Sequence, residues 1–92
     1  MARLKPSIRS TETYTESNFL RVQTQALKPG DLRVATIEHL CYDAEKAAEP
    51  HGGWHCHTIV DFEEMSKEDA LFIAKAYALE NGIPVIYESH AD

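Results

Sequence analysis

The stretch SKEDALFIAKAYALENG, residues 66–82, decides the fold because it specifies one helix together with both of its ends. Ser66 and Asp69 form the capping-box pattern that begins helices, with Asp in place of the more usual Glu. Gly82 is the residue type that ends helices in a left-handed conformation. The sequence therefore predicts a helix over residues 67–81.

Extended segments lie on both sides of this helix. Residues 14–27 contain neither Gly nor Pro, and from Leu20 to Ala26 the side chains alternate as in a half-buried strand. The same reasoning predicts strands over residues 32–42, 54–62 and 83–88, a tight turn over residues 28–31, and a loop over residues 43–53. Pro84 restricts the last strand to a sheet edge, or the proline to the start of that strand.

The order β-β-β-α-β predicts an α+β fold. We expect a three- to four-stranded, mostly antiparallel sheet with one helix packed on a face. The expected organisation is an irregular basic arm over residues 1–13, followed by a single α+β domain over residues 14–92.

Composition limits the classes of protein to which the chain could belong. Its 92 residues suit one domain, and 43% apolar and 26% charged residues are ordinary for a globular protein. We find no apolar run of about 18 residues and no secretory signal pattern. Two cysteines without an export signal favour a reducing compartment, so we expect free thiols and a cytoplasmic location in a host cell.

Charge is distributed unevenly along the chain, whose net charge is −6. Residues 1–33 carry six Lys or Arg and three acids, whereas residues 34–92 carry three Lys or Arg and twelve acids. Clustered basic side chains can hold phosphate oxygens, which predicts a partner- or nucleic-acid-binding surface in the first third. Its candidate residues are Arg3, Lys5, Arg9, Arg21, Lys28 and Arg33. Two alternatives stay open: a solvated surface without a binding role, and an acidic binding face at Asp61, Glu63, Glu64, Glu68 and Asp69.

Histidines and cysteines concentrate between residues 39 and 57. If Tyr42 lies opposite Trp54 in a hairpin, side-chain alternation places four of them on one face: His39, Cys41, His55 and His57. Such a set suits Zn²⁺, so a zinc-binding domain or small metalloenzyme is an alternative. The tight Cys spacing of most zinc sites is absent, and we expect structural or contact residues with no metal or other cofactor.

The opposite face of the same hairpin is predicted to form the core beneath the helix. Its expected members are Leu40, Tyr42, Trp54, Cys56, Val60 and Phe62. A nucleophilic pair of Cys41 and His55 is conceivable, but the sequence offers no orienting Asp or Asn and no enzyme signature. We therefore expect a protein that is not an enzyme.

The helix has a second apolar side that includes Phe72 and Leu79. A helix on a single sheet normally shows a cleaner polar stripe, so something is expected to cover this side. The N-terminal arm is one candidate. A second copy is the other, which would make the chain a homodimeric regulatory module.

The profile of the whole chain resembles that of small phage-encoded anti-CRISPR proteins. It shares with them a length under a hundred residues, a single α/β domain, an acidic body and no catalytic motif. The resemblance rests on size and charge layout and not on particular residues. It implies a monomer or weak dimer that inhibits an RNA-guided protein–nucleic-acid complex by occupying its nucleic-acid-binding surface.

Overall fold

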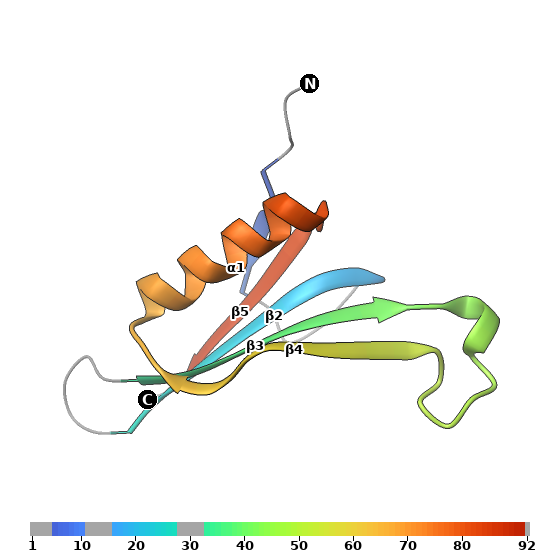
Figure 1. The fold of residues 1–92 in the computed structure, drawn as a ribbon, viewed down its shortest axis with the longest axis horizontal. Helices are drawn as coiled ribbons and strands as arrows, with labels where there is room; N and C mark the ends of the chain where they lie inside the picture. The colour runs from blue at the N-terminus through green and yellow to red at the C-terminus, as the bar shows by residue number, and fades with distance from the viewer. Residues whose placement is uncertain (1–4, 11–15, 28–32, 92) are drawn as a thin grey trace.

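The computed structural model describes residues 5–10, 16–27 and 33–91, and shows one sheet with a single α-helix on one face (Figure 1). The elements in chain order are β1 (Ser7–Arg9), β2 (Asn18–Ala26), β3 (Arg33–Tyr42), the 3₁₀ helix η1 (Ala44–Lys46), β4 (Trp54–Glu64), α1 (Lys67–Asn81) and β5 (Val85–Ala91).

The sheet has five strands in the order β1-β5-β2-β3-β4. Strands β2, β3 and β4 form an antiparallel meander, whereas β5 pairs parallel with β2, and β1 pairs parallel with β5. Because β4 and β5 run in the same direction, they need a crossover connection, and α1 supplies it. The predicted α+β fold with one helix on a face is confirmed, but the sheet is mixed and larger than predicted.

One prediction near the ends of the chain differs from the structure, whereas Pro84 lies immediately before the last strand, next to the start position that was one of its two expected places. Ser7–Arg9, expected to be irregular, form β1 beside β5. Strand β5 is an interior strand, and Pro84 precedes it, where its carbonyl accepts a hydrogen bond from the Ser7 N–H at 2.9 Å. The predicted turn over residues 28–31 lies outside the described residues.

The helix α1 begins and ends where the sequence predicts. The Ser66 hydroxyl accepts a hydrogen bond from the Asp69 N–H at 3.1 Å, and Gly82 ends the helix with φ 66°. Three alanines form its buried face, which lets the helix backbone approach the sheet closely: Ala70, Ala74 and Ala78. Among the described residues, we find no helix with the length and apolarity needed to cross a bilayer.

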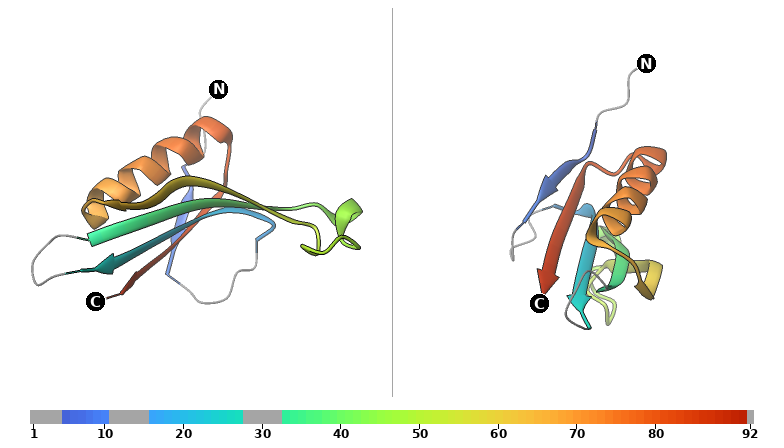
Figure 2. Two further views of the ribbon diagram at one scale, coloured as in Figure 1. Left: turned by 60° about the horizontal axis from the view of Figure 1, so that its bottom comes forward. Right: turned by 90° about the vertical axis from the view of Figure 1, so that its left-hand side faces the viewer.

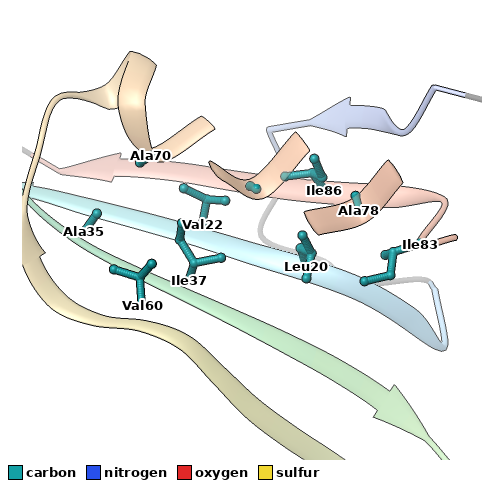
Figure 3. Close-up of a cluster of buried hydrophobic side chains, with 10 residues drawn as sticks. Leu20, Val22, Ala35, Ile37, Val60, Ala70, Ala78, Ile83 and Ile86 are labelled. Atoms are coloured by element: carbon teal, nitrogen blue, oxygen red, sulfur yellow. The ribbon is translucent and has the colours of Figure 1, made fainter. Parts of the chain in front are cut away.

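The main core lies between α1 and the central strands, as Figure 3 shows. Its buried members are Leu20, Val22, Ala35, Ile37, Val60, Ala70, Ala74, Ala78, Ile83 and Ile86. A smaller buried cluster of Phe19, Val85 and Tyr87, with Leu40 packed against it, belongs to the other side of the sheet. The central strands are therefore apolar on both faces, and β2 contributes neighbouring residues to the two clusters.

The second apolar side of α1 is only partly covered. A pocket of about 300 Å³ is lined by Leu79 and Lys75 of the helix and by Lys5, Pro6 and Ile8 of the arm. Phe72 does not line this pocket, and 73% of its surface is exposed. The described part of the arm, residues 5–10, thus reaches the C-terminal half of the helix and does not cover Phe72.

Candidate functional site

The outer ends of β3 and β4 form a hairpin that projects beyond the helix. Figures 1 and 2 show it extending away from the body, with η1 at its tip. Strand β3 is largely buried over its first half, whereas residues 54–58 of β4 are all exposed. The outer part of the hairpin therefore exposes the side chains of five consecutive residues of β4.

The turn at the tip of this hairpin depends on the backbone conformation of Gly53. Gly53 has φ 86°, and a Cβ there would stand 2.5 Å from the Asp43 carbonyl oxygen, so only glycine fits. The Gly53 carbonyl accepts a hydrogen bond from the Asp43 N–H at 2.7 Å. The Asp43 carboxylate accepts another from the Glu45 N–H at 3.0 Å and caps η1.

The predicted register of the hairpin is confirmed. Tyr42 pairs with Trp54, Cys41 with His55, and His39 with His57. The His and Cys side chains therefore share one face, but it is the face that carries α1. The His39 ring lies 6.0 Å from the Tyr77 ring of α1, and its Nε2 lies 2.6 Å from Asn18 Oδ1.

The surroundings of His39 disfavour its charged form. Desolvation by burial is the main cause that lowers the pKa of His39, and the nearby His57 adds a repulsive charge. Among the described residues, no three His, Cys, Asp or Glu side chains are placed to hold a metal ion. The arrangement needed for the zinc alternative is therefore not formed by this cluster.

The surroundings of Cys56 are not those of an activated nucleophile. Cys41 is half-buried and Cys56 is exposed, and both are free thiols. Burial, and then a hydrogen bond to the Glu38 carboxylate at 3.2 Å, raise the pKa of the Cys56 thiol. A raised pKa reduces the thiolate fraction at neutral pH, which works against nucleophilic chemistry.

The face opposite the histidines carries aromatic side chains. Trp54 lies 5.9 Å from Phe19 in an edge-to-face arrangement and 5.3 Å from Tyr42, measured between ring centroids. Phe19 in turn meets Tyr87 edge-to-face at 5.1 Å. Trp54 and Tyr42 are 39% and 37% exposed, so the prediction that they form the core beneath the helix is wrong.

Two irregularities in β4 explain this error. The register shifts between Ala35 and Ile37 and again between Ile37 and Glu38, so β4 contains bulges. They bring Val60 opposite Ile37 in the helix-side core, although simple alternation from Trp54 would place Val60 on the other face. Phe62 has φ 54°, a strained value for a non-glycine residue, and is 60% exposed.

The predicted basic residues do not gather on one surface of the described structure. Lys5 and Arg9 are exposed at the β1 edge, where Arg9 pairs with Glu16 at 3.1 Å. Arg21 forms a salt bridge with Glu38 at 2.6 Å on the open face of the sheet. Two further members, Arg3 and Lys28, lie outside the described residues.

Arg33 differs from the other candidates because it is a buried structural residue. Only 8% of its surface is exposed. Its guanidinium donates to the Ala91 carbonyl at 2.8 Å and to the Thr24 hydroxyl at 3.2 Å. The expectation that Arg33 offers a surface charge to phosphate is wrong, because its side chain joins β2, β3 and β5 at the sheet end.

Negative charge concentrates around the hairpin tip, β4 and the start of α1. Residues 43–69 contain eight acids and two lysines, a net charge of −6 that equals that of the whole chain. Seven of the eight acids are exposed, and Asp43 alone is half-buried. A comparison of residues 1–33 with residues 34–92 does not reveal this acidic segment. A charge count over residues 43–69 does.

No protein-family model, curated protein or solved structure matches this chain.

Proposed function

We propose that this chain is a non-enzymatic binding protein that inhibits a protein–nucleic-acid complex of the RNA-guided, CRISPR surveillance type. It occupies the nucleic-acid-binding surface of that complex, and residues 43–69 make the contact. One observation carries the proposal: the whole net charge of −6 falls within these residues, whose first part is the projecting hairpin tip.

Charge complementarity explains the choice of partner surface. A channel that holds nucleic acid is lined by Lys and Arg, and exposed carboxylates compete with phosphates for those cations. Asp61, Glu63 and Glu64 are exposed at the end of β4. None of the three makes an ion pair with another described residue, so all three carboxyl groups are accessible to a partner.

The hairpin supplies a geometric reason as well. An element exposed on several sides can enter a channel that a flat surface only covers, and Tyr42 and Trp54 provide an aromatic contact within it. Tyr and Trp are enriched among the residues that dominate binding energy at protein interfaces. The carboxylates would then attract the partner, and the aromatic pair would hold it.

The structure supports this acidic surface over the basic one first expected. The guanidinium groups of Arg21 and Arg33 make internal hydrogen bonds, so turning either toward phosphate would break contacts within the fold. Arg9 of β1 and Lys5, just before this strand, stay exposed, and β1 lies at the opposite edge of the sheet from β4. They are the natural control residues for a test of the acidic surface.

The experiment uses purified guide-RNA effector complexes, each offered its target DNA with and without this protein. We expect the protein to block DNA binding by one of them, and the combined variant Asp61→Asn, Glu63→Gln, Glu64→Gln to bind that complex at least about tenfold more weakly. The matched control Lys5→Gln, Arg9→Gln should bind as the unmodified protein does. Raising the salt concentration should weaken binding.

If the Lys5→Gln, Arg9→Gln variant loses binding and the acidic variant keeps it, the basic arm makes the contact, and the proposal of an acidic binding surface is wrong. Failure to bind any effector complex would overturn the proposed function itself.

A further inference from the structure

The two edges of the sheet differ greatly in length. Strand β1 has three residues and β4 has eleven, and among the described strands each pairs with a single neighbour. An edge strand presents unpaired N–H and C=O groups that can pair with another chain. Short edges are poor templates for pairing, so β4 is the edge where strand addition could occur.

Only the body-side half of β4 carries features that prevent such pairing. Residues 59–64 include both bulges, the positive-φ residue Phe62 and the acids Asp61, Glu63 and Glu64. Bulges and edge charges are known devices against strand pairing. Residues 54–58 contain no proline, Asp, Glu, Lys or Arg, and they keep a regular register with β3.

Hydrogen bonding shows which backbone groups face the open edge. The Asp43 N–H donates to the Gly53 carbonyl, so the groups of these two residues point between the strands. Inward and outward pairs alternate in an antiparallel ladder. The N–H and C=O groups of His55 and His57 therefore point toward β3, and those of Cys56 and Thr58 point outward, away from the sheet.

We propose that residues 54–58 accept an extended, positively charged segment of a partner protein as an additional strand. This rests on the proposed function and names the part of the partner that is bound. Main-chain pairing with Cys56 and Thr58 gives affinity, as in other cases of strand addition. Glu45 and Glu49 lie before this open edge, and Asp61 follows it, so basic side chains at both ends of the segment would be favoured.

The same charges argue against a second copy of this chain as the occupant. Edge-to-edge pairing of two copies would bring two segments of net charge −6 together. Like charges brought together at an interface cost binding energy and suppress that pairing.

The test uses a short peptide of alternating valine and threonine with lysines at both ends. We expect it to slow amide hydrogen exchange at Cys56 and Thr58 by about tenfold or more and to leave His55 and His57 unchanged. A counterpart peptide with glutamates in place of the lysines should bind about tenfold more weakly or not at all. Protection confined to other strands, or equal binding of the two peptides, would overturn the proposal.

A backbone variant tests the same edge without changing charge. Cys56→Pro removes an outward N–H and is compatible with an edge strand, whereas the matched Cys56→Val keeps that N–H. Both variants lose the thiol contact with Glu38. We expect Cys56→Pro to reduce peptide affinity by about tenfold and Cys56→Val by less than about twofold.

The remaining outcomes also decide between explanations. Equal peptide binding by the two folded variants would overturn strand addition. Protection of Cys56 that rises with protein concentration without peptide would show that a second copy is the occupant, which also overturns it. If Cys56→Pro still inhibits an effector complex fully, strand addition fails while the proposed function stands, because this variant retains every carboxylate.

Discussion

The two ends of the β3–β4 ladder present different surfaces although the same two strands build them. Near the body, Ile37 is completely buried beneath α1. At the outer end, Trp54 remains 39% exposed, and no residue of the adjoining loop except Gly53 is buried. The body end holds the fold together, and the outer end leaves its side chains available for binding.

Charge divides the molecule in a similar way. Outside residues 43–69 the chain carries seven acids and seven Lys or Arg, so its net charge there is zero. Arg9, Arg21 and Arg33 use their guanidinium groups in contacts within the fold. The balanced part is therefore stabilised by its own contacts, whereas the acidic part keeps charges that its own side chains do not neutralise.

The largest effect is expected when one side chain at each end of the β3–β4 ladder is replaced by alanine. Ile37→Ala should lower the free energy of unfolding by about 2–5 kcal/mol, because it leaves a cavity under α1. Trp54→Ala should cost about 1 kcal/mol, since it mainly loses aromatic contacts with Phe19 and Tyr42. Urea denaturation, monitored by circular dichroism, measures the free energy of unfolding of both variants.

The reverse order of these two costs would break the comparison. It would mean that the aromatic cluster on the open face is the principal core. Phe72→Ala is the control for a large exposed side chain, and it should change stability by less than about 0.5 kcal/mol.

The sequence predicts those elements whose signals are local. Ser66 and Gly82 specify the two ends of α1, and both act as caps in the structure. The pairing of Tyr42 with Trp54 was assumed from their places at the two ends of the loop, and the structure has it, together with the shared face of the histidines and cysteines. Nothing local indicates that β5 inserts beside β2 or that β1 joins β5, because both pairings connect residues distant in sequence.

The facing of the hairpin could not be predicted for a different reason. Alternation propagates a choice of face along a strand only while the register is regular, and β4 gains bulges between Thr58 and Glu63. Side chains counted outward from Trp54 therefore change face before they reach the body. The sequence offers the acidic residues of the candidate site as one alternative binding face. It does not show that Arg21 and Arg33 are occupied by contacts within the fold, because those contacts depend on tertiary structure.

A smaller effect is expected at the hairpin tip, where two adjacent glycines offer a matched pair. Gly53→Ala should cost about 1–3 kcal/mol, because its Cβ would collide with the Asp43 carbonyl at a positive φ. Gly52→Ala also has positive φ, but no atom lies within 4 Å of its Cβ, so about 1 kcal/mol is expected. Thermal melts compare the two variants.

Amide exchange should locate the effect of Gly53→Ala in the outer hairpin and leave the strands beneath α1 protected. Loss of protection throughout the core would contradict the separation of the two ends. It would show that the tip and the body unfold as one cooperative unit.

The smallest effect concerns pH and His39, whose ring lies beside Tyr77 of the helix. Burial, with a contribution from His57, lowers the pKa of His39 below its ordinary 6.5. The unfolded chain therefore takes up this proton at a higher pH than the folded chain, and stability is lost as pH falls below about 6.5 and through the lowered pKa. We expect His39→Gln to flatten the dependence of unfolding free energy on pH between 7.5 and 5.5, and His57→Gln to raise the pKa of His39.

NMR titration of the His39 ring should give a midpoint below 6.5 in the unmodified protein. A midpoint at or above 6.5 would contradict this prediction, as would an unchanged pH dependence in His39→Gln. Either result would mean that water reaches His39 beside α1 as freely as it reaches the hairpin tip.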